Sequence, residues 1–421
     1  MARKLVFYSV LVYLFIAGLL YMYIFKWADT SIPASYKGSS ADPRTFMNGR
    51  ELLLSEEYSE IRNYLFFLST PYEWLFYLII LVAGFSVRFE KSSSVFKKIG
   101  ILNNAIYLFW LSIVSYLVVF PFNYAGYCLS KKYNISTQSF SSWMKDEVID
   151  FWVNFGLMII IVSVLYWLMK KSAKRWWLYA WMLSVPFTLF LMFVQPVLID
   201  PLYNDFYPLK NKVLEEKILE LAEEAKIPAD HVYEVNMAEK TNSMNAYVTG
   251  IGSNSRIVLW DTTLNKLSED EILFIMAHEM AHYVEKHIYI GIAGYLLLTL
   301  VGLWLTSKLM NVMIRKWGGV LNISSISRIQ SLPLFLLIIS VLLFASSPIT
   351  NAVSRHQERR ADAYAIEMTK DKKAAVSTFQ ELSKAGLSQV NPPLLVKIFR
   401  YSHPTMLERI STLEQYDEKQ K

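Results

Sequence analysis

The stretch "FIMAHEMAHYVEKH", Phe274–His287, joins a polar segment to a long apolar one. Three histidines and two glutamates lie within these fourteen residues, in a chain of 421 residues that has only six histidines. The preceding "LSEDE" has a serine three residues before a glutamate, which is the capping-box signature of a helix start. The following residues, 288–312, are apolar over a length that can cross a bilayer. We therefore expect one helix that carries the histidines and continues into a membrane span.

The composition is that of an integral membrane protein. Hydrophobic residues make up 54% of the chain and charged residues only 19%, less than soluble proteins of this length usually carry. A soluble protein with a very apolar core is excluded, because the apolar runs are too long. The first run is expected to be retained, because no A-x-A-like cleavage site follows it. We predict about seven spans, at 5–25, 73–90, 101–127, 150–169, 176–199, 288–312 and 331–350.

Several other kinds of site find no support in the sequence. Cys128 is the single cysteine, so we expect neither an intramolecular disulfide nor a cysteine-ligated zinc site. The formal net charge of +6 comes mainly from short loops between the spans. The sequence has no aromatic-interleaved basic patch and no glycine-rich phosphate loop. We therefore predict no nucleic-acid partner.

The polar segments flank a two-span hairpin. Residues 1–199 are mostly membrane, with five spans and two polar loops, and residues 287–350 hold the last two spans. The polar residues 200–286 precede this hairpin and 351–421 follow it, so both emerge on the same side of the membrane. We expect them to form one domain in two parts.

The first polar segment has mixed secondary-structure patterns. Residues 209–226 combine helical apolar spacing with opposing charges, which predicts an amphipathic surface helix. Three short β-branched and aromatic stretches, 231–235, 245–250 and 256–261, are separated by turn residues. These stretches predict a small antiparallel sheet. The fold class is therefore mainly α and membrane-embedded, with a metallopeptidase-like domain that carries a small sheet.

The histidine stretch has the spacing of a metal site. His278 and His282 are four residues apart, so on a helix both imidazoles face one side and reach one ion. H-E-x-x-H on a helix is a zinc metalloprotease pattern, in which the glutamate, here Glu279, is the general base. Zinc takes neutral imidazoles and keeps one position for water, which it acidifies. Because five residues also match by chance, a third ligand is needed.

The segment 355–366, "RHQERRADAYAI", offers that ligand just past the last span. Glu358 and Asp362 are four residues apart and share a helical face. One carboxylate can bind the metal while the other accepts a hydrogen bond from a ligating histidine. The alternative is a solvated charged face in which Glu358 pairs with a neighbouring arginine.

Two further histidines and one arginine are weaker candidates for residues of the site. His403 and Arg409 in "SHPTMLERI" could stabilise an oxyanion, although a histidine before a proline usually marks a turn. His287 lies five residues after His282, about 140° around a continuous helix. It is therefore interpreted as an interfacial or supporting residue rather than a ligand.

Seven motifs together give a resemblance that is more specific than H-E-x-x-H. The chain resembles the type I CAAX prenyl proteases, integral-membrane zinc metalloproteases that also mature the yeast a-factor pheromone. The resemblance covers almost the whole chain and rests on "PFNYAGYCLSKKYNISTQSF", "QPVLIDPLYNDFYPL", "NSMNAYVTG", "RIVLWDTTL", "HEMAH", "ERRAD" and "SHPTMLERI". It implies seven helices around a water-filled chamber, with the zinc domain closing one end.

The resemblance also implies a role for each candidate. One Zn²⁺ per chain would be held by His278, His282 and Glu358, with Glu279 as base and Asp362 as the supporting carboxylate. The scissile carbonyl or oxyanion would be contacted by His403 and Arg409. An extended substrate would pair with the edge strand formed by Asn245, Ala246 and Tyr247.

The distribution of basic residues predicts a membrane orientation that differs from that of this family. Short basic segments fall on one side of a seven-span topology, so the positive-inside rule places the zinc domain outside the cytoplasm. The family members face their zinc to the cytosol, where prenylated C-termini lie. Either this chain is inverted relative to those members, or charges that line the chamber mislead the rule. The membrane would be the cell membrane in a bacterium or the endoplasmic reticulum in a eukaryote. The basic residues are Arg3, Lys4, Arg88, Lys97, Lys98, Lys170, Lys171, Lys174, Arg175, Lys308, Arg315, Lys316 and Arg328.

The sequence therefore predicts a membrane-embedded zinc metalloendopeptidase that acts on peptide or protein substrates. The protein is surrounded by the lipid bilayer, and its site is expected at the membrane surface or in a water-filled chamber, not in lipid. The resemblance implies removal of C-terminal tripeptides from prenylated proteins. One alternative is a quality-control or peptide-processing protease without prenyl specificity. A site-2-type intramembrane protease would need its motif inside an apolar span, but polar residues precede Phe274. A non-catalytic receptor or transporter would have broken ligand positions.

Overall fold

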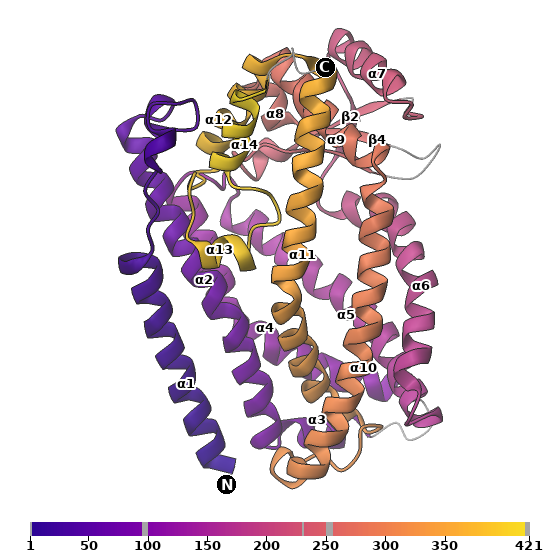
Figure 1. The fold of residues 1–421 in the computed structure, drawn as a ribbon. Helices are drawn as coiled ribbons and strands as arrows, with labels where there is room; N and C mark the ends of the chain where they lie inside the picture. The colour runs from indigo at the N-terminus through magenta and orange to yellow at the C-terminus, as the bar shows by residue number, and fades with distance from the viewer. Residues whose placement is uncertain (1, 95–99, 230, 250–255, 417–421) are drawn as a thin grey trace.

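Seven long apolar helices and a polar domain make up the part of the molecule that the structure describes. The helices are long and apolar enough to cross a membrane, as the sequence predicts. In Figure 1 they stand side by side, with the N-terminus at one end and the polar elements and C-terminus at the other. Lys97, Lys98 and Gly250, which enter the predictions above, lie outside the described residues. This computed structural model describes residues 2–94, 100–229, 231–249 and 256–416.

Five of the seven described spans are longer than the apolar runs that predict them. The last one, α11, has 38 residues and extends about 57 Å. It therefore leaves the membrane and enters the polar domain as one continuous helix. The spans are α1 (Ala2–Met22), α2 (Gly49–Val82), α4 (Gly100–Lys132), α5 (Phe140–Lys171), α6 (Trp176–Val194), α10 (His287–Leu321) and α11 (Leu332–Thr369).

The predicted second span is present, but its predicted bounds, 73–90, are wrong. α2 ends at Val82, and Gly84 adopts φ 71°, a left-handed conformation that glycine tolerates well. The next helix, α3 (Phe85–Ser93), is separate. α2 begins far upstream, where the Asn48 side chain caps its first turn. The charged first half of α2 conceals this start from a hydropathy pattern.

The sheet is mixed rather than antiparallel. Its strands lie in the order β1-β2-β4-β3, and β2 and β4 are parallel while the other two pairs are antiparallel. The prediction failed because the chain crosses from β2 to the far edge, forms β3, and returns through the middle as β4. β1 is too short to produce a sequence pattern. The strands are β1 (Phe206–Pro208), β2 (Val232–Val235), β3 (Ala246–Thr249) and β4 (Arg256–Trp260).

Helix α9 lies at the centre of the polar domain. One side of it packs with α7 and the sheet, in a core that includes Ile218, Leu259 and Met276. The other side packs with α11, α12 and α14, where Phe274 meets Phe379 edge to face. The remaining helices are α7 (Lys212–Glu224), α8 (Asp261–Lys266), α9 (Glu269–Val284), α12 (Lys372–Ala385), α13 (Leu394–Phe399) and α14 (Met406–Glu414).

The prediction that α9 continues into the sixth span is wrong. The predicted capping box is present, with Ser268 and Glu271 closing the start of α9. However, Lys286 adopts φ 58° and ψ 31°, and α10 begins afresh at His287. A left-handed residue other than glycine costs about 1–2 kcal/mol. Contacts of the neighbouring residues Glu285 and His287 offset this cost.

Candidate metal centre

Three side chains from two helices converge on one point. His278 Nε2 lies 3.3 Å from His282 Nε2 and 3.2 Å from Glu358 Oε2. His282 Nε2 lies 3.6 Å from Glu358 Oε1. One ligand atom from each of these residues falls within 4.8 Å of the others. The structure thus brings together the two histidines of α9 and the carboxylate that follows the last span.

The close approach of α9 and α11 makes this convergence possible. Ala277 on α9 and Ala361 and Ala365 on α11 are completely buried. Small side chains let two helix backbones approach closely, so polar residues of both helices can reach a common ion. Because α11 is continuous, packing of the last span also positions Glu358.

A buried carboxylate holds the first histidine. His278 Nδ1 lies 2.9 Å from Asp362 Oδ1. Asp362 also accepts two hydrogen bonds from Arg409, whose Nε is 2.9 Å from Oδ2. The Arg409 guanidinium carbon lies 3.9 Å from the centre of the Phe379 ring. Because His278 Nδ1 donates to Asp362, its Nε2 lone pair is directed toward His282 and Glu358.

The second histidine has a chain of supporting residues, of which the sequence indicated only His287. His287 Nδ1 lies 3.0 Å from His282 Nδ1, and His287 Nε2 lies 3.2 Å from Glu285 Oε2. Arg360 donates to both oxygens of Glu285. A continuous helix would separate the two histidine rings, but the break at Lys286 turns His287 back over His282. No spacing rule signals such a break.

The donor set fits a zinc ion. With both Nδ1 atoms donating to other groups, both Nε2 lone pairs and the Glu358 carboxylate face one another. Glu358 Oε2 is buried and meets no hydrogen-bond partner among the described residues, although His278 Nε2 is near. Three acceptors in contact need a shared cation, and two imidazoles with one carboxylate form a known catalytic zinc set. Burial opposes protonation of His278, but the nearby carboxylates of Asp362 and Glu358 raise its pKa to about 9 without metal.

The candidate base and the candidate oxyanion contact lie beside this cluster. Glu279 is the neighbour of His278 on α9, and burial raises its pKa to about 7. His403 Nε2 lies 3.5 Å from Glu358 Oε1, and the His403 side chain is 57% exposed. It is therefore far more accessible than His278, His282 and Glu358. Arg409, by contrast, is buried and engaged by Asp362.

The predicted substrate strand lies at the edge of the sheet. β3 pairs with β4 on one side, and no described strand pairs with its other side. Ala246 is buried and packs with the core that contains α9. The Asn245 carbonyl is already occupied, because it accepts hydrogen bonds from Trp260 N at 3.1 Å and Thr263 Oγ1 at 2.8 Å. Free backbone groups for an added strand therefore lie beyond Asn245.

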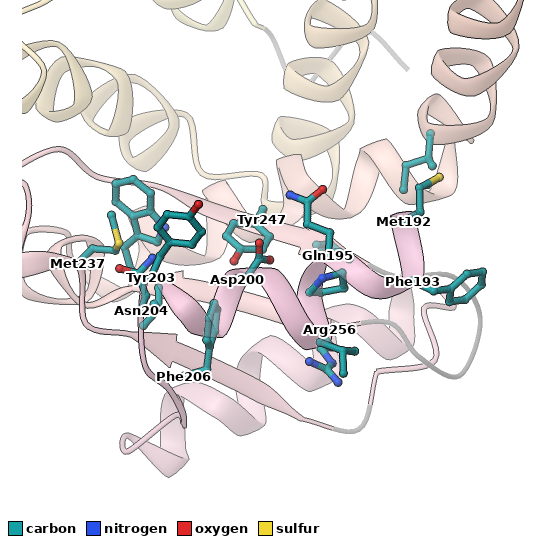
Figure 2. Close-up of a pocket in the computed structure, with 16 residues that line it drawn as sticks. Met192, Phe193, Gln195, Asp200, Tyr203, Asn204, Phe206, Met237, Tyr247 and Arg256 are labelled. Carbon is teal, nitrogen blue, oxygen red and sulfur yellow. The ribbon is translucent and has the colours of Figure 1, made fainter. Parts of the chain in front are cut away.

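A cavity of about 810 Å³ lies against the opposite face of the sheet. Figure 2 shows Gln195 and Asp200, from the end of the fifth span, beside Tyr247 of β3. None of the three converging ligands lines this cavity. The metal centre is therefore identified by its three ligand atoms and not by the size of a cavity.

Known proteins share both halves of this architecture. A model of peptidase family M48 matches residues 208–417, and a model described as the CAAX prenyl protease N-terminal region with five membrane helices matches residues 30–205. A Bacillus subtilis protein named "Uncharacterized metalloprotease YhfN" is 53% identical over 98% of this chain and 97% of its own length. The chain belongs to peptidase family M48. Its resemblance to the CAAX prenyl proteases is confirmed.

More distant relatives support the same fold. CAAX prenyl protease 1 of Saccharomyces cerevisiae is 29% identical over 83% of this chain and 79% of its own length. The crystal structure of Saccharomyces mikatae Ste24p superposes with a TM-score of 0.81 at 24% identity and covers 98% of both chains. The protein is thus a multi-pass membrane metalloprotease, and the receptor or transporter alternative is set aside.

Proposed function

We propose that the protein is a zinc endopeptidase with one Zn²⁺ per chain, held by His278, His282 and Glu358. The observation that carries this proposal is the convergence of three acceptor atoms, with a buried Glu358 oxygen lacking any hydrogen-bond donor among the described residues. Zinc bound there would polarise the scissile carbonyl and make a water molecule a stronger acid.

The remaining roles follow from position. Glu279 accepts the proton of the attacking water and returns it to the leaving amine; its raised pKa suits both steps. His403 faces the cluster and donates to the developing oxyanion. Two nitrogens of Arg409 are engaged by Asp362, so we assign Arg409 to positioning His278 through Asp362 instead of the carbonyl contact that the resemblance implies. Ala246 and Tyr247, with Asn245 at their start, pair with an extended substrate.

Glu279→Gln tests the mechanism. We expect this variant to bind zinc like the wild type, because the base is not a ligand, and to lose at least about 100-fold in peptide cleavage. Metal analysis of the purified protein and cleavage of a peptide library, with and without chelator, provide the two readouts. Full activity of Glu279→Gln, or chelator-resistant cleavage by the wild type, would remove the proposal.

Prenylated proteins are the first substrate class to consider. Relatives that include the yeast, human and plant proteins are named CAAX prenyl protease 1, which favours cleavage near a prenylated C-terminus. Matched peptides with and without a farnesyl group would test this. Equal cleavage of both would favour the alternative, a quality-control or peptide-processing protease.

The charge distribution favours that alternative. The end of the molecule that carries α3 and the N-terminus lies opposite the metal centre (Figure 1) and carries the basic segments around Arg88, Lys170 and Arg315. By the positive-inside rule this end faces the cytoplasm, which places the metal centre outside it. Prenylated C-termini are cytosolic, so an extracytoplasmic site would act on other peptides.

A further inference from the structure

Two arginines without acidic partners line a cavity of about 330 Å³. Arg62 lies on α2, and Arg400 directly follows the last residue of α13. Residues of α4 form the third wall of the cavity. No acidic side chain lines this cavity. Among the described residues, neither guanidinium forms an ion pair within 4.0 Å. The cavity therefore concentrates positive charge that the protein itself does not neutralise.

Both guanidinium groups contact uncharged side chains. Arg400 Nη1 donates to Asn63 Oδ1, and its guanidinium carbon lies 5.8 Å from the Phe66 ring centre. The Arg62 guanidinium carbon lies 5.8 Å from the Tyr58 ring centre. Asn63 is completely buried, and its Nδ2 donor has no partner among the described residues. Burial and the like charge of Arg62 lower the pKa of Arg400 to about 10, so Arg400 is still a cation at neutral pH.

This cavity is connected to the metal centre by a short, anchored stretch of chain. Arg355 Nη1 donates to the carbonyl oxygens of Lys397, at 2.9 Å, and Tyr401, at 2.7 Å. Arg355 lies three residues before Glu358 on α11, so the stretch is fixed beside the metal ligand. His403, three residues after Arg400, reaches Glu358. Three residues span at most about 11 Å, which bounds the backbone distance from Arg400 to His403.

We propose that Arg400 and Arg62 bind the free α-carboxylate of the substrate. Guanidinium groups bind carboxylates through paired, charge-assisted hydrogen bonds. Arg400 is half-buried, whereas Arg62 is exposed and accessible to a substrate. This inference rests on the proposed peptidase function and adds a specificity element to it. Because the backbone from Arg400 to His403 spans at most about 11 Å, a carboxylate held there places cleavage near the carboxyl end of the substrate.

A peptide library with two kinds of carboxyl end tests this assignment. The zinc-loaded full-length protein in detergent is incubated with the same peptides bearing either free or amidated C-termini, and mass spectrometry locates the cleavages. We expect free ends to be cleaved about 10- to 100-fold more efficiently, the range for a hydrogen bond to a charged group, at a nearly constant distance from the end. Arg400→Gln should abolish this preference and leave cleavage of amidated peptides unchanged.

Matched variants make the result specific to the cavity. Arg400→Lys keeps the charge without the paired geometry and should retain part of the preference. Arg50→Gln removes an exposed arginine from the start of α2 and should retain all of it. Unchanged cleavage of amidated peptides also shows that Arg400→Gln folds and binds zinc.

Three outcomes would overturn the assignment. Equal cleavage of free and amidated peptides by the wild type removes it, as does a preference that survives in both Arg400→Gln and Arg62→Gln. Activity that requires phosphatidylglycerol instead of phosphatidylcholine vesicles, and loses this requirement in Arg400→Gln, assigns the cavity to a lipid phosphate. Failure of the peptidase proposal looks different, because then neither kind of peptide is cleaved by the zinc-loaded wild type.

Discussion

At the scale of single residues, the donor atoms of the metal centre are arranged by groups that do not touch the metal. Asp362 and His287 each contact the Nδ1 atom of one ligating histidine. Both contacts leave the Nε2 lone pairs facing Glu358. An Nδ1–Nδ1 contact needs one donor and one acceptor, so His282 donates and His287 accepts. His287 then donates its Nε2 proton to Glu285.

His287→Ala should weaken zinc binding about 10- to 100-fold, the usual effect of removing a group that orients a metal ligand. Chelator competition measures this directly. His287→Gln should recover part of the affinity, because its amide oxygen can accept the same proton. His231→Ala, at an exposed histidine, is the matched control and should bind zinc normally. Zinc retention in His287→Ala equal to that of the control would contradict this role.

The sequence predicted the ligand residues but only part of their support. His278, His282 and Glu358 follow from helical spacing and a carboxylate just past the last span. The choice between Glu358 and Asp362 came from the resemblance, because both lie on one helical face. No sequence pattern indicated the roles of Glu285 and Arg360, because their contact depends on a left-handed residue that such a pattern does not mark.

At the scale of elements, the break between α9 and α10 is the feature that shapes the site. It ends the helix that carries the metal motif and starts the sixth span in a new direction. The same break brings His287 onto His282. A single strained residue, Lys286, makes both changes.

Lys286→Gly should stabilise the protein by about 0.5–1 kcal/mol, because glycine adopts the left-handed conformation without the steric cost, although its unfolded chain is more flexible. Lys286→Val should destabilise it by at least about 1 kcal/mol and accelerate zinc release, since a β-branched residue disfavours this conformation. Thermal unfolding in detergent and chelator-induced zinc release measure the two effects. A lower melting temperature in Lys286→Gly would refute the strain argument.

Elements with strong periodic or apolar patterns were predicted, and their ends were not. The spans and the amphipathic α7 follow from hydropathy and helical spacing. The second span was misplaced because charged residues fill the first half of α2, and Gly84 ends the helix before Arg88. The parallel pairing of β2 with β4 depends on a long crossover, which local alternation does not encode.

At the scale of the whole molecule, seven spans place the N-terminus opposite the metal centre. The number of spans and the shared side of both polar segments were predicted from the sequence. The close packing of α9 with α11 was not, because it depends on alanines that are far apart in the chain. This packing makes the last span part of the active-site scaffold.

Reporter fusions test the orientation of the whole molecule. A fusion after Glu414 should be active with a reporter that works outside the cytoplasm and inactive with a cytoplasmic reporter, because the basic segments around Arg88, Lys170 and Arg315 lie at the other end. A fusion in the Ser172–Arg175 turn should give the opposite pattern. The reverse result at both sites would place the metal centre in the cytoplasm and favour prenylated substrates.

Anomalous diffraction at the zinc absorption edge tests the central claim most directly. Crystals of the purified protein should show one strong peak per chain, about 2.0–2.2 Å from His278 Nε2, His282 Nε2 and one oxygen of Glu358. The peak should vanish below the edge, which identifies the element. A zinc peak elsewhere in the chain, or none between these three side chains in protein purified with zinc, would contradict the account.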